Sequence, residues 1–267
     1  MSVAPFTLIS GPCVVETEEL TLRIAAELKR LAAEAGLPLV FKASFDKANR
    51  SGAGAQRGVG IEEGLRVLKK VKDELGLPVT TDLHETVQAE QVASVVDILQ
   101  IPAFLCRQTD LLLACAAAAK KYGRSVNVKK GQFLAPEDVD NIAEKLRSGG
   151  LGANDYWITE RGTTFGYRNL VVDMRGLAQM KAAGHRVIFD ATHSVQRPGG
   201  LGKATGGDGA LAPVLARAAV AVGIDGLFIE THPDPMTSPS DGPNMIPLAE
   251  MGPLLRKLVR IHEAARA

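Results

Sequence analysis

The sequence predicts a single (β/α)8 barrel, the TIM-barrel fold, over residues 1–267. Its 267 residues, of which 46% are hydrophobic and 23% charged, suit one barrel of about 250 residues and leave no room for a second full domain. A joint between helix and strand recurs along the chain, and chemically capable side chains stand where the strands end. These three observations together favour the barrel.

The recurring joint places a glycine at the end of a helical stretch and then an apolar strand that closes on a polar residue. Its clearest copies read AGLPLVFKAS, LGLPVTTDLH, AGHRVIFDAT and VGIDGLFIETH, with their glycines at Gly36, Gly76, Gly184 and Gly223. Glycine at a helix C-terminus adopts the left-handed conformation without strain, and a proline soon after stops the helix. Each copy therefore predicts where a helix ends and a strand begins.

The strands predicted from these joints, with the weaker copies filled in, span 7–10, 39–43, 79–82, 97–101, 126–129, 155–160, 187–191 and 226–230. Between them apolar residues recur every three to four positions, as at Leu20, Ile24, Leu28 and Leu31, which is typical of a helix with one buried face. Short apolar strands that alternate with helices indicate parallel pairing with both faces covered. An open doubly wound sheet is the rival fold, but no strand is followed by GxGxxG, and eight units favour closure.

The charge and cysteine content argue against several classes of protein. Lys and Arg total 31 against 30 Asp and Glu, so the net charge of +1 supplies no field that would attract nucleic acid or an anionic membrane. The longest uncharged apolar stretch is far shorter than the ~20 residues of a membrane span. Cys13, Cys106 and Cys115 form neither an even set nor a CxxC pair, which indicates a reducing compartment. We expect a cytoplasmic protein.

Cationic side chains stand at several strand ends. Lys42 and Lys129 close apolar strands, and Lys47 and Arg161 follow shortly after strand ends. Because all βα loops of a barrel open on one mouth, these cations should converge there and bind phosphate or carboxylate by charge-assisted hydrogen bonds. Solvated surface charge is the usual fate of Lys and Arg, but the position of two of them on strand ends favours an anion site.

A second group of side chains has the chemistry of metal ligands. Cys13, His193, Glu230 and Asp241 belong to the first, seventh and eighth βα loops, which are neighbours in a closed barrel. Thiolate, imidazole and carboxylate together suit Zn²⁺, Fe²⁺ or Mn²⁺ and do not suit Mg²⁺ or Ca²⁺. Spacing alone does not separate this hypothesis from a buried structural cysteine beside ordinary loop carboxylates.

Three of the five histidines, His84, His193 and His232, lie at strand ends, whereas His185 precedes a strand and His262 lies on the last helix. Any one of the three could be an ordinary hydrogen-bonded loop histidine. Three at one mouth favour a functional role.

Segments spread along the whole chain resemble the 3-deoxy-manno-octulosonate-8-phosphate synthase family. They read GPCVVE, FKASFDKANRS, TDLHE, LQIPAFLCRQTDLL, VNVKKGQF, TERGTTFGYRNLVVDMR, DATHSVQRPGG and IETHPDP followed by SDGPNM. They run in order from residue 11 to residue 245 and cover nearly every βα junction. The resemblance implies a transferase that condenses phosphoenolpyruvate with arabinose 5-phosphate, releasing phosphate, in the synthesis of 3-deoxy-manno-octulosonate (Kdo) for lipopolysaccharide. It implies no organic cofactor.

The resemblance also assigns residues. It places phosphoenolpyruvate on Lys42, Lys47, His84, Lys129 and Arg161, with Gln100 and Ala103 beside them, and the sugar phosphate on Asn49, Arg50 and Ser51. Asp82 and His84 are implied to handle protons or to orient the aldehyde, so Lys42, Asp82, His84 and Lys129 are the expected catalytic residues. Arg107 is implied to reach into a neighbouring subunit's site, which predicts a homotetramer.

The residue in the GPC block divides the family into two classes. Members that need a metal carry Cys in this block, and metal-independent members carry Asn. The present chain has Cys13. The resemblance therefore implies one divalent Zn, Fe or Mn per subunit, held by Cys13, His193, Glu230 and Asp241.

One departure concerns the sugar-phosphate loop. After KANRS the family usually continues with a further Ser and bulkier residues, whereas this chain reads GAGAQRG, with small residues over 52–55. The sugar is therefore less certain than phosphoenolpyruvate, and the related 3-deoxy-arabino-heptulosonate-7-phosphate synthases, which take a four-carbon aldehyde phosphate, remain an alternative. The glycine-rich loop 199–209 follows His193, and we expect it to close over the site.

Two further alternatives belong to other classes. A Schiff-base aldolase would form an imine at Lys42 or Lys129. A non-catalytic barrel that binds sugar phosphates would keep the cations without needing the four metal-type ligands, so their presence argues against it.

Overall fold

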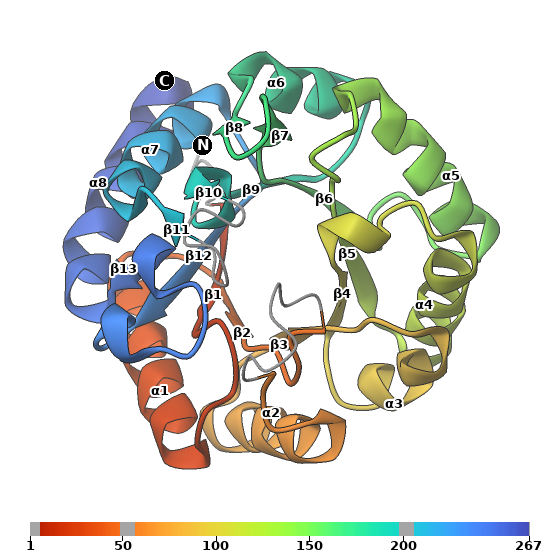
Figure 1. Cartoon of the computed structure of the whole chain (residues 1–267), viewed down its shortest axis with the longest axis horizontal. Helices are drawn as coiled ribbons and strands as arrows, with labels where there is room; N and C mark the ends of the chain where they lie inside the picture. The colour runs from red at the N-terminus through yellow and green to blue at the C-terminus, as the bar shows by residue number, and fades with distance from the viewer. Residues whose placement is uncertain (1–5, 49–56, 198–205, 267) are drawn as a thin grey trace.

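The barrel is closed. The computed structural model describes residues 6–48, 57–197 and 206–266, and within them eight parallel strands form a barrel ringed by helices (Figure 1). The barrel strands are β1 (Thr7–Gly11), β2 (Leu39–Lys42), β3 (Val79–Asp82), β4 (Ile98–Ile101), β5 (Ser125–Lys129), β6 (Tyr156–Glu160), β9 (Val187–Asp190) and β12 (Gly226–His232). All eight predicted strands are confirmed to within two residues at each end. Because β1 pairs with β2 on one side and with β12 on the other, the rival open sheet is excluded.

Helices follow the strands and cover the outside of the barrel (Figure 1). They are α1 (Glu18–Glu34), α2 (Ile61–Leu75), α3 (Ala89–Ala93), α4 (Thr109–Tyr122), α5 (Val139–Ser148), α6 (Met174–Ala182), α7 (Ala212–Val222) and α8 (Leu248–Arg266). Their apolar faces pack against the sheet, as Leu28 of α1 and Leu68 of α2 show by being fully buried. None of the helices within the described ranges has the length and apolar character of a membrane span.

The glycines that the sequence places at helix ends do adopt left-handed backbone conformations. Their φ angles are 67° at Gly36, 63° at Gly76, 89° at Gly184 and 100° at Gly223. An L side chain is strained in this region, which is why glycine recurs there and why the joint could be read from the sequence.

Shorter elements follow the C-terminal ends of the last barrel strands. A hairpin of β7 (Thr163–Thr164) and β8 (Leu170–Val171) follows β6, and a second hairpin of β10 (Gln196–Arg197) and β11 (Gly206–Gly207) follows β9. The strand β13 (Ile246–Pro247) extends the sheet beyond β12. Single turns of 3-10 helix also lie in βα loops, among them η2 (Ala103–Leu105) after β4, η4 (His193–Val195) after β9 and η7 (Gly242–Asn244) after β12. These elements fix the backbone around the barrel mouth.

The barrel interior changes from apolar to polar along the strands. A separate cluster of six buried side chains, one from each of six strands, consists of Ile9, Val40, Ile98, Trp157, Ile188 and Phe228. Side chains two residues apart share a face of a strand. The next inward position is therefore polar on most of these strands: Lys42, Gln100, Thr159, Asp190 and Glu230. The apolar layer thus forms the floor of a polar chamber at the C-terminal mouth.

Two aspartates that directly precede strands link strands to helices at the N-terminal end of the barrel, opposite the mouth. Asp97, just before β4, accepts hydrogen bonds from Val79 N (2.9 Å) and Lys72 Nζ (2.6 Å). Asp225, just before β12, does the same with Val187 N (2.8 Å) and Lys181 Nζ (2.5 Å). Each carboxylate ties the first N–H of the neighbouring strand to the preceding helix, so this end of the barrel is structural.

Candidate active site

Charged side chains are buried together at the C-terminal mouth. Lys42, Asp190 and Glu230 are at most 1% exposed, and Lys47, Lys129 and Arg161 are at most 9% exposed. An unpaired buried charge is costly, so such groups persist only when they are paired or when they serve a ligand. The mouth is therefore the candidate site.

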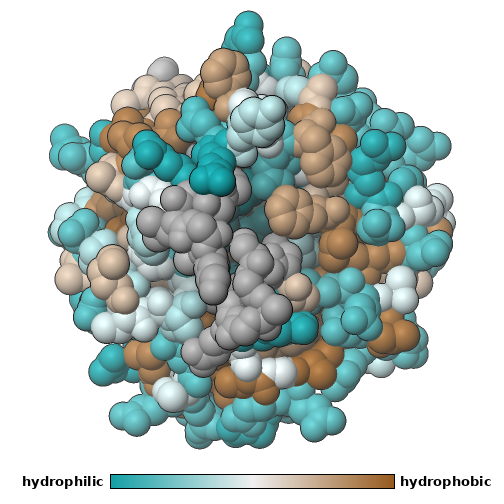
Figure 2. Space-filling model, in the orientation of Figure 1, coloured by the Kyte–Doolittle hydropathy of each residue, from teal (hydrophilic) through white to brown (hydrophobic). Residues whose placement is uncertain are grey.

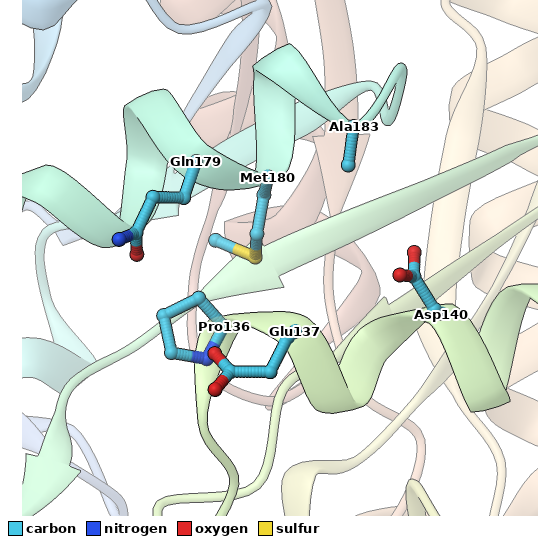
Figure 3. A pocket seen from close by; sticks show the side chains of 6 residues that line it. All are labelled: Pro136, Glu137, Asp140, Gln179, Met180 and Ala183. Atoms are coloured by element: carbon cyan, nitrogen blue, oxygen red, sulfur yellow. The ribbon is translucent and has the colours of Figure 1, made fainter.

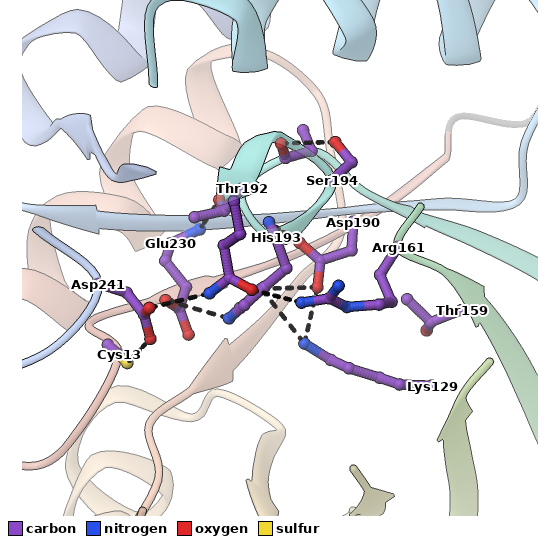
Figure 4. A network of polar contacts seen from close by, with 12 residues as sticks. Cys13, Lys129, Thr159, Arg161, Asp190, Thr192, His193, Ser194, Glu230 and Asp241 are labelled. Carbon is purple, nitrogen blue, oxygen red and sulfur yellow. Dashed lines mark hydrogen bonds and ion pairs between the residues drawn. The ribbon is translucent and has the colours of Figure 1, made fainter. Parts of the chain in front are cut away.

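Three of the four predicted metal ligands form one cluster. The side chains of Cys13, Glu230 and Asp241 each bring a ligand atom within 4.8 Å of the others. Cys13 Sγ lies 3.0 Å from Ser240 Oγ and 3.2 Å from Asp241 Oδ2. Asp241 has a left-handed φ of 53°, a conformation uncommon outside glycine and often found at functional sites. Figure 4 shows the three side chains converging from separate segments.

In each carboxylate of this cluster, one oxygen accepts a hydrogen bond from a neighbouring side chain and the other oxygen faces the cluster. Glu230 Oε1 accepts from Lys42 Nζ at 2.7 Å, and Lys42 also donates to the Cys13 carbonyl at 2.9 Å. Glu230 Oε2 is buried without a hydrogen-bond partner among the described residues. Asp241 Oδ1 accepts from Gln196 Nε2 at 2.8 Å, while Oδ2 faces Cys13. Partners of this kind orient ligands in metal sites.

His193, the fourth predicted ligand, stands at the edge of the cluster. Its Nδ1 lies 2.7 Å from Asp190 Oδ2, and its Nε2 lies 3.6 Å from Glu230 Oε2 (Figure 4). Because a carboxylate only accepts, the Asp190 contact places a proton on His193 Nδ1 and leaves Nε2 as the nitrogen that faces Glu230. Lys129 Nζ also donates to Asp190 Oδ2, at 2.7 Å.

The chemistry of these residues fits a divalent transition metal. Burial raises the pKa of the Cys13 thiol well above its ordinary value, and the nearby Glu230 carboxylate raises it further, so the thiol keeps its proton and donates it to Asp241. Burial would also raise the pKa of Asp241, but the charges of His193 and Lys47 and the bond from Cys13 bring it well below its usual range. A cation could take the place of the thiol proton, with Glu230 Oε2, which accepts no hydrogen bond from the described residues, as a further ligand.

The predicted cations face the same chamber. Arg161 Nη2 donates to Gln196 Oε1, and Arg161 Nη1 is buried without a hydrogen-bond partner in the described ranges. Burial opposes the charge on Lys47, yet the surrounding Cys13, Glu230 and Asp82 raise the pKa of its ammonium well above its usual value. Lys47 and Arg161 therefore both bring positive charge near Asp241.

A chain of buried hydrogen bonds crosses four neighbouring strands and positions Lys47. Thr159 Oγ1 donates to Asn127 (2.7 Å), whose Nδ2 donates to Gln100 (3.0 Å), whose amide donates to Asp82 Oδ1. Ser44 Oγ donates to Asp82 Oδ2 (2.6 Å) and accepts from Lys47 Nζ (2.9 Å). Burial would raise the pKa of Asp82, but Lys42, Lys47 and Lys129 lower it well below its usual value. Asp82 is therefore an acceptor at the centre of this network.

The remaining predicted residues fall in three places. His84 follows β3, stacks edge-on against Phe45 at 5.9 Å between ring centroids, and has its pKa lowered by burial. Ala103 is buried at the start of η2, whereas Arg107 is exposed and stands apart from the buried cluster. The predicted sugar-phosphate residues Asn49, Arg50 and Ser51 lie outside the described residues, as do residues 52–56 and most of loop 199–209.

Sequence reasoning missed three uncharged residues of the site. Ser44, Asn127 and Gln196 join the charged groups to one another, but such residues occur in every loop and strand and carry no distinctive spacing. Asp190 contacts both Lys129 and His193, and these contacts could not be read from the sequence.

A cavity of about 330 Å³ lies outside the barrel, between α5 and α6 (Figure 3). It is lined by Pro136, Glu137, Asp140, Gln179, Met180 and Ala183. It is separate from the chamber at the mouth, and its charged lining residues are both acidic, so it does not suit anionic substrates.

Comparison with known proteins gives consistent matches over nearly the whole chain. Residues 3–266 match the family described as the DAHP synthetase I family. The 2-dehydro-3-deoxyphosphooctonate aldolase of Synechococcus sp. is 58% identical over 260 residues, covering 97% of this chain and 89% of that protein. The proteins of the same name from Bordetella petrii and Burkholderia vietnamiensis are 55% and 54% identical, each covering 98% of this chain and 92% of the relative.

Proposed function

This chain belongs to the DAHP synthetase I family, and we propose that within it the chain acts as a 2-dehydro-3-deoxyphosphooctonate aldolase, like the relatives that it most resembles here. It condenses phosphoenolpyruvate with D-arabinose 5-phosphate and water to give 3-deoxy-D-manno-octulosonate 8-phosphate and inorganic phosphate. The enzyme is a transferase of Kdo biosynthesis. The single observation that best supports this chemistry is that Arg161 Nη1 is buried without a hydrogen-bond partner among the described residues, at a mouth where Lys47, Lys129 and the metal-type cluster are buried as well.

In the mechanism that we favour, the third carbon of phosphoenolpyruvate attacks the aldehyde, water adds to the second carbon, and the tetrahedral intermediate expels phosphate. Arg161 and Lys129 hold the phosphate and carboxylate, which places positive charge where negative charge develops. Lys47, fixed by Ser44 and the Asp82 network, supplies a further cation. His84, whose pKa is lowered by burial, is a neutral candidate for moving a proton at the aldehyde oxygen.

The metal-requiring class is the part of the proposal that rests on Cys13. The residues that would hold the ion are Cys13, Glu230 and Asp241, whose ligand atoms form one cluster, together with His193, whose Nε2 lies 3.6 Å from Glu230 Oε2. The opposite atoms of the two carboxylates and of the imidazole are already held by Lys42, Gln196 and Asp190. When bound, a divalent Zn, Fe or Mn would act as a Lewis acid toward the aldehyde oxygen or lower the pKa of a water. An asparagine at position 13 would supply no thiolate.

The chemistry of the lysines disfavours a Schiff-base aldolase. Lys42 Nζ is 2.7 Å from Glu230, and Lys129 Nζ is 2.7 Å from Asp190. A nucleophilic lysine is usually activated by an apolar pocket or by another cation, whereas both of these amines lie in ion pairs.

We also propose that the active form is a homotetramer in which Arg107 of one subunit reaches the site of a neighbouring subunit. Large apolar side chains stand exposed in three consecutive loops on the face that carries the mouth: Phe104 (56%), Phe133 (58%), Phe165 (70%) and Tyr167 (103%). Figure 2 shows brown side chains gathered beside the central hollow. Exposed apolar patches of this kind are typical of protein interfaces. Three unpaired, buried cysteines are consistent with a cytoplasmic location.

Release of inorganic phosphate tests the proposal. Phosphoenolpyruvate is supplied with arabinose 5-phosphate or with erythrose 4-phosphate, with and without a chelator, and the oligomeric state is measured by sedimentation of the same preparation. We expect metal-dependent turnover that prefers arabinose 5-phosphate. Preference for erythrose 4-phosphate would move the chain to the heptulosonate branch, and full activity of Cys13→Asn after chelation would refute the metal class. Cys115→Ser, a buried cysteine of α4, is the matched control.

A further inference from the structure

One side chain touches both halves of the site. Gln196, on β10, donates from Nε2 to Asp241 Oδ1 at 2.8 Å and accepts at Oε1 from Arg161 Nη2. Arg161 and Asp241 come from different loops and are held in a fixed relation by this one amide. Each contact uses one polar atom of the partner, so Asp241 Oδ2 still faces Cys13 and Arg161 Nη1 has no hydrogen-bond partner among the described residues.

The polarity of the amide matches both partners. A guanidinium only donates and a carboxylate only accepts, so a side chain that joins them end to end must present an acceptor to the first and a donor to the second. Glutamine does this with one fixed orientation of its amide, and neither a carboxylate nor an ammonium can. We propose that Gln196 is a positioning residue that couples the anion-binding guanidinium of Arg161 to the metal-side carboxylate of Asp241.

The backbone of Gln196 is itself well placed to transmit such a coupling. Gln196 pairs with Gly207 in the β10–β11 hairpin, and Asp208 N donates to Val195 O at 3.1 Å. A Cβ at Gly207 would come within 1.5 Å of Asn244 Oδ1, so the hairpin packs directly on the loop that carries Asp241. The amide is thus held against both partners by the fold as well as by its two hydrogen bonds.

The coupling predicts that Arg161 favours metal binding, whereas its positive charge alone would oppose it. An anion bound to Arg161 would fix the guanidinium and, through Gln196, the position of Asp241 for metal binding. By reciprocity, a metal bound to Asp241 would fix Arg161 for anion binding. Loss of Arg161 would therefore weaken metal binding, although removal of a nearby positive charge should strengthen the binding of a cation. The identification of the anion as phosphoenolpyruvate rests on the proposed function, but the sign of this effect does not.

The test uses Co²⁺ as the metal and no substrate. Co²⁺ is titrated into the chelator-treated full-length protein, and its binding is followed by the thiolate-to-cobalt absorption that Cys13 would give. We expect Gln196→Met to weaken Co²⁺ binding by about 10- to 100-fold, the range for partners that orient metal ligands. Gln179→Met, at an exposed glutamine of α6, controls for the substitution itself and should leave Co²⁺ binding unchanged.

The decisive comparison removes two different cations. Arg161→Met should weaken Co²⁺ binding several-fold, and this weakening should vanish when Gln196 is already Met. Lys47→Met removes a charge that also acts on Cys13 and Asp241, but Lys47 forms no hydrogen bond with Gln196 in the described part of the chain, so the substitution should strengthen Co²⁺ binding. Stronger or unchanged Co²⁺ binding in Arg161→Met, or unchanged binding in Gln196→Met, would overturn the coupling. A protein that passes this test but releases no phosphate from phosphoenolpyruvate would refute the proposed function alone.

Discussion

Replacement of Lys42 by methionine tests how the buried charges at the mouth hold one another. Lys42 is 1% exposed, and its ammonium lies 2.7 Å from Glu230 Oε1 and 2.9 Å from the Cys13 carbonyl. Methionine fills a similar volume but has no charge and no donor. The substitution therefore leaves the fully buried Glu230 carboxylate without its counter-ion while it changes the packing little.

The expected cost follows from the burial of the pair. Removal of one partner from a buried ion pair costs roughly 3–5 kcal/mol of unfolding free energy. A divalent metal would return positive charge to Glu230, so the variant should gain more stability from metal than the unaltered protein does. Each tenfold gain in metal affinity adds about 1.4 kcal/mol to that difference.

Lys130→Met is the matched control. Lys130 is also 1% exposed, and its ammonium lies 3.2 Å from Glu160, which is not among the predicted metal ligands. We expect a comparable loss of about 3–5 kcal/mol in this variant. Metal should stabilise it by the same increment as the unaltered protein, because its metal cluster is intact.

Urea unfolding with a chelator and with excess Zn²⁺ measures both quantities. Far-UV circular dichroism follows the helices, and the fluorescence of Trp157, the single tryptophan and part of the barrel floor, follows the interior. Coincident transitions would justify a two-state treatment. A loss below about 1 kcal/mol in Lys42→Met would refute the ion-pair reasoning, and equal metal increments in the two variants would refute the role given to Glu230.

Two further predictions concern the network at the mouth and the opposite end of the barrel. The pKa of the Asp82 carboxyl is lowered in the folded protein, so its contribution to stability is present above its unfolded pKa of about 3.9 and is lost as the pH falls below that value. The Asp82→Asn variant should therefore show a shallower decline of the urea midpoint between pH 5 and pH 3. An unchanged slope would contradict the assignment. Asp97→Ala removes the acceptor for Lys72 and for the N–H of Val79, and it should lower the free energy of unfolding by about 1–3 kcal/mol. Phosphate release at 25 °C should be unaffected. A loss of activity in the folded variant would argue that this end of the barrel is not purely structural.

The positions of the strands and helices could be predicted because they follow from local rules. A helix that ends at Gly76 or Gly223 needs a left-handed residue there, and the apolar run that follows can only be a buried strand. Eight repetitions then close a barrel whose mouth collects the strand ends. This rule places Lys42, Lys129 and Glu230 correctly without any knowledge of their contacts.

The pairing of the charges could not be predicted in this way. Lys42 and Glu230 are 188 residues apart in the sequence, and nothing in the spacing distinguishes Glu230 from other strand-end acids as the partner of Lys42. The same holds for Lys129 and Asp190. Such choices depend on which inward-facing positions meet across the closed barrel, and that is set by strand register.

The sequence by itself therefore determined the fold class, the eight strands and the set of residue types that gather at the mouth, because glycine conformation and apolar periodicity act over a few residues at a time. Only the tertiary structure decided how these residues are connected. Gln196 is the clearest case, since an uncharged amide gives no signal in the sequence, and its place between Arg161 and Asp241 exists only where two distant loops meet in space.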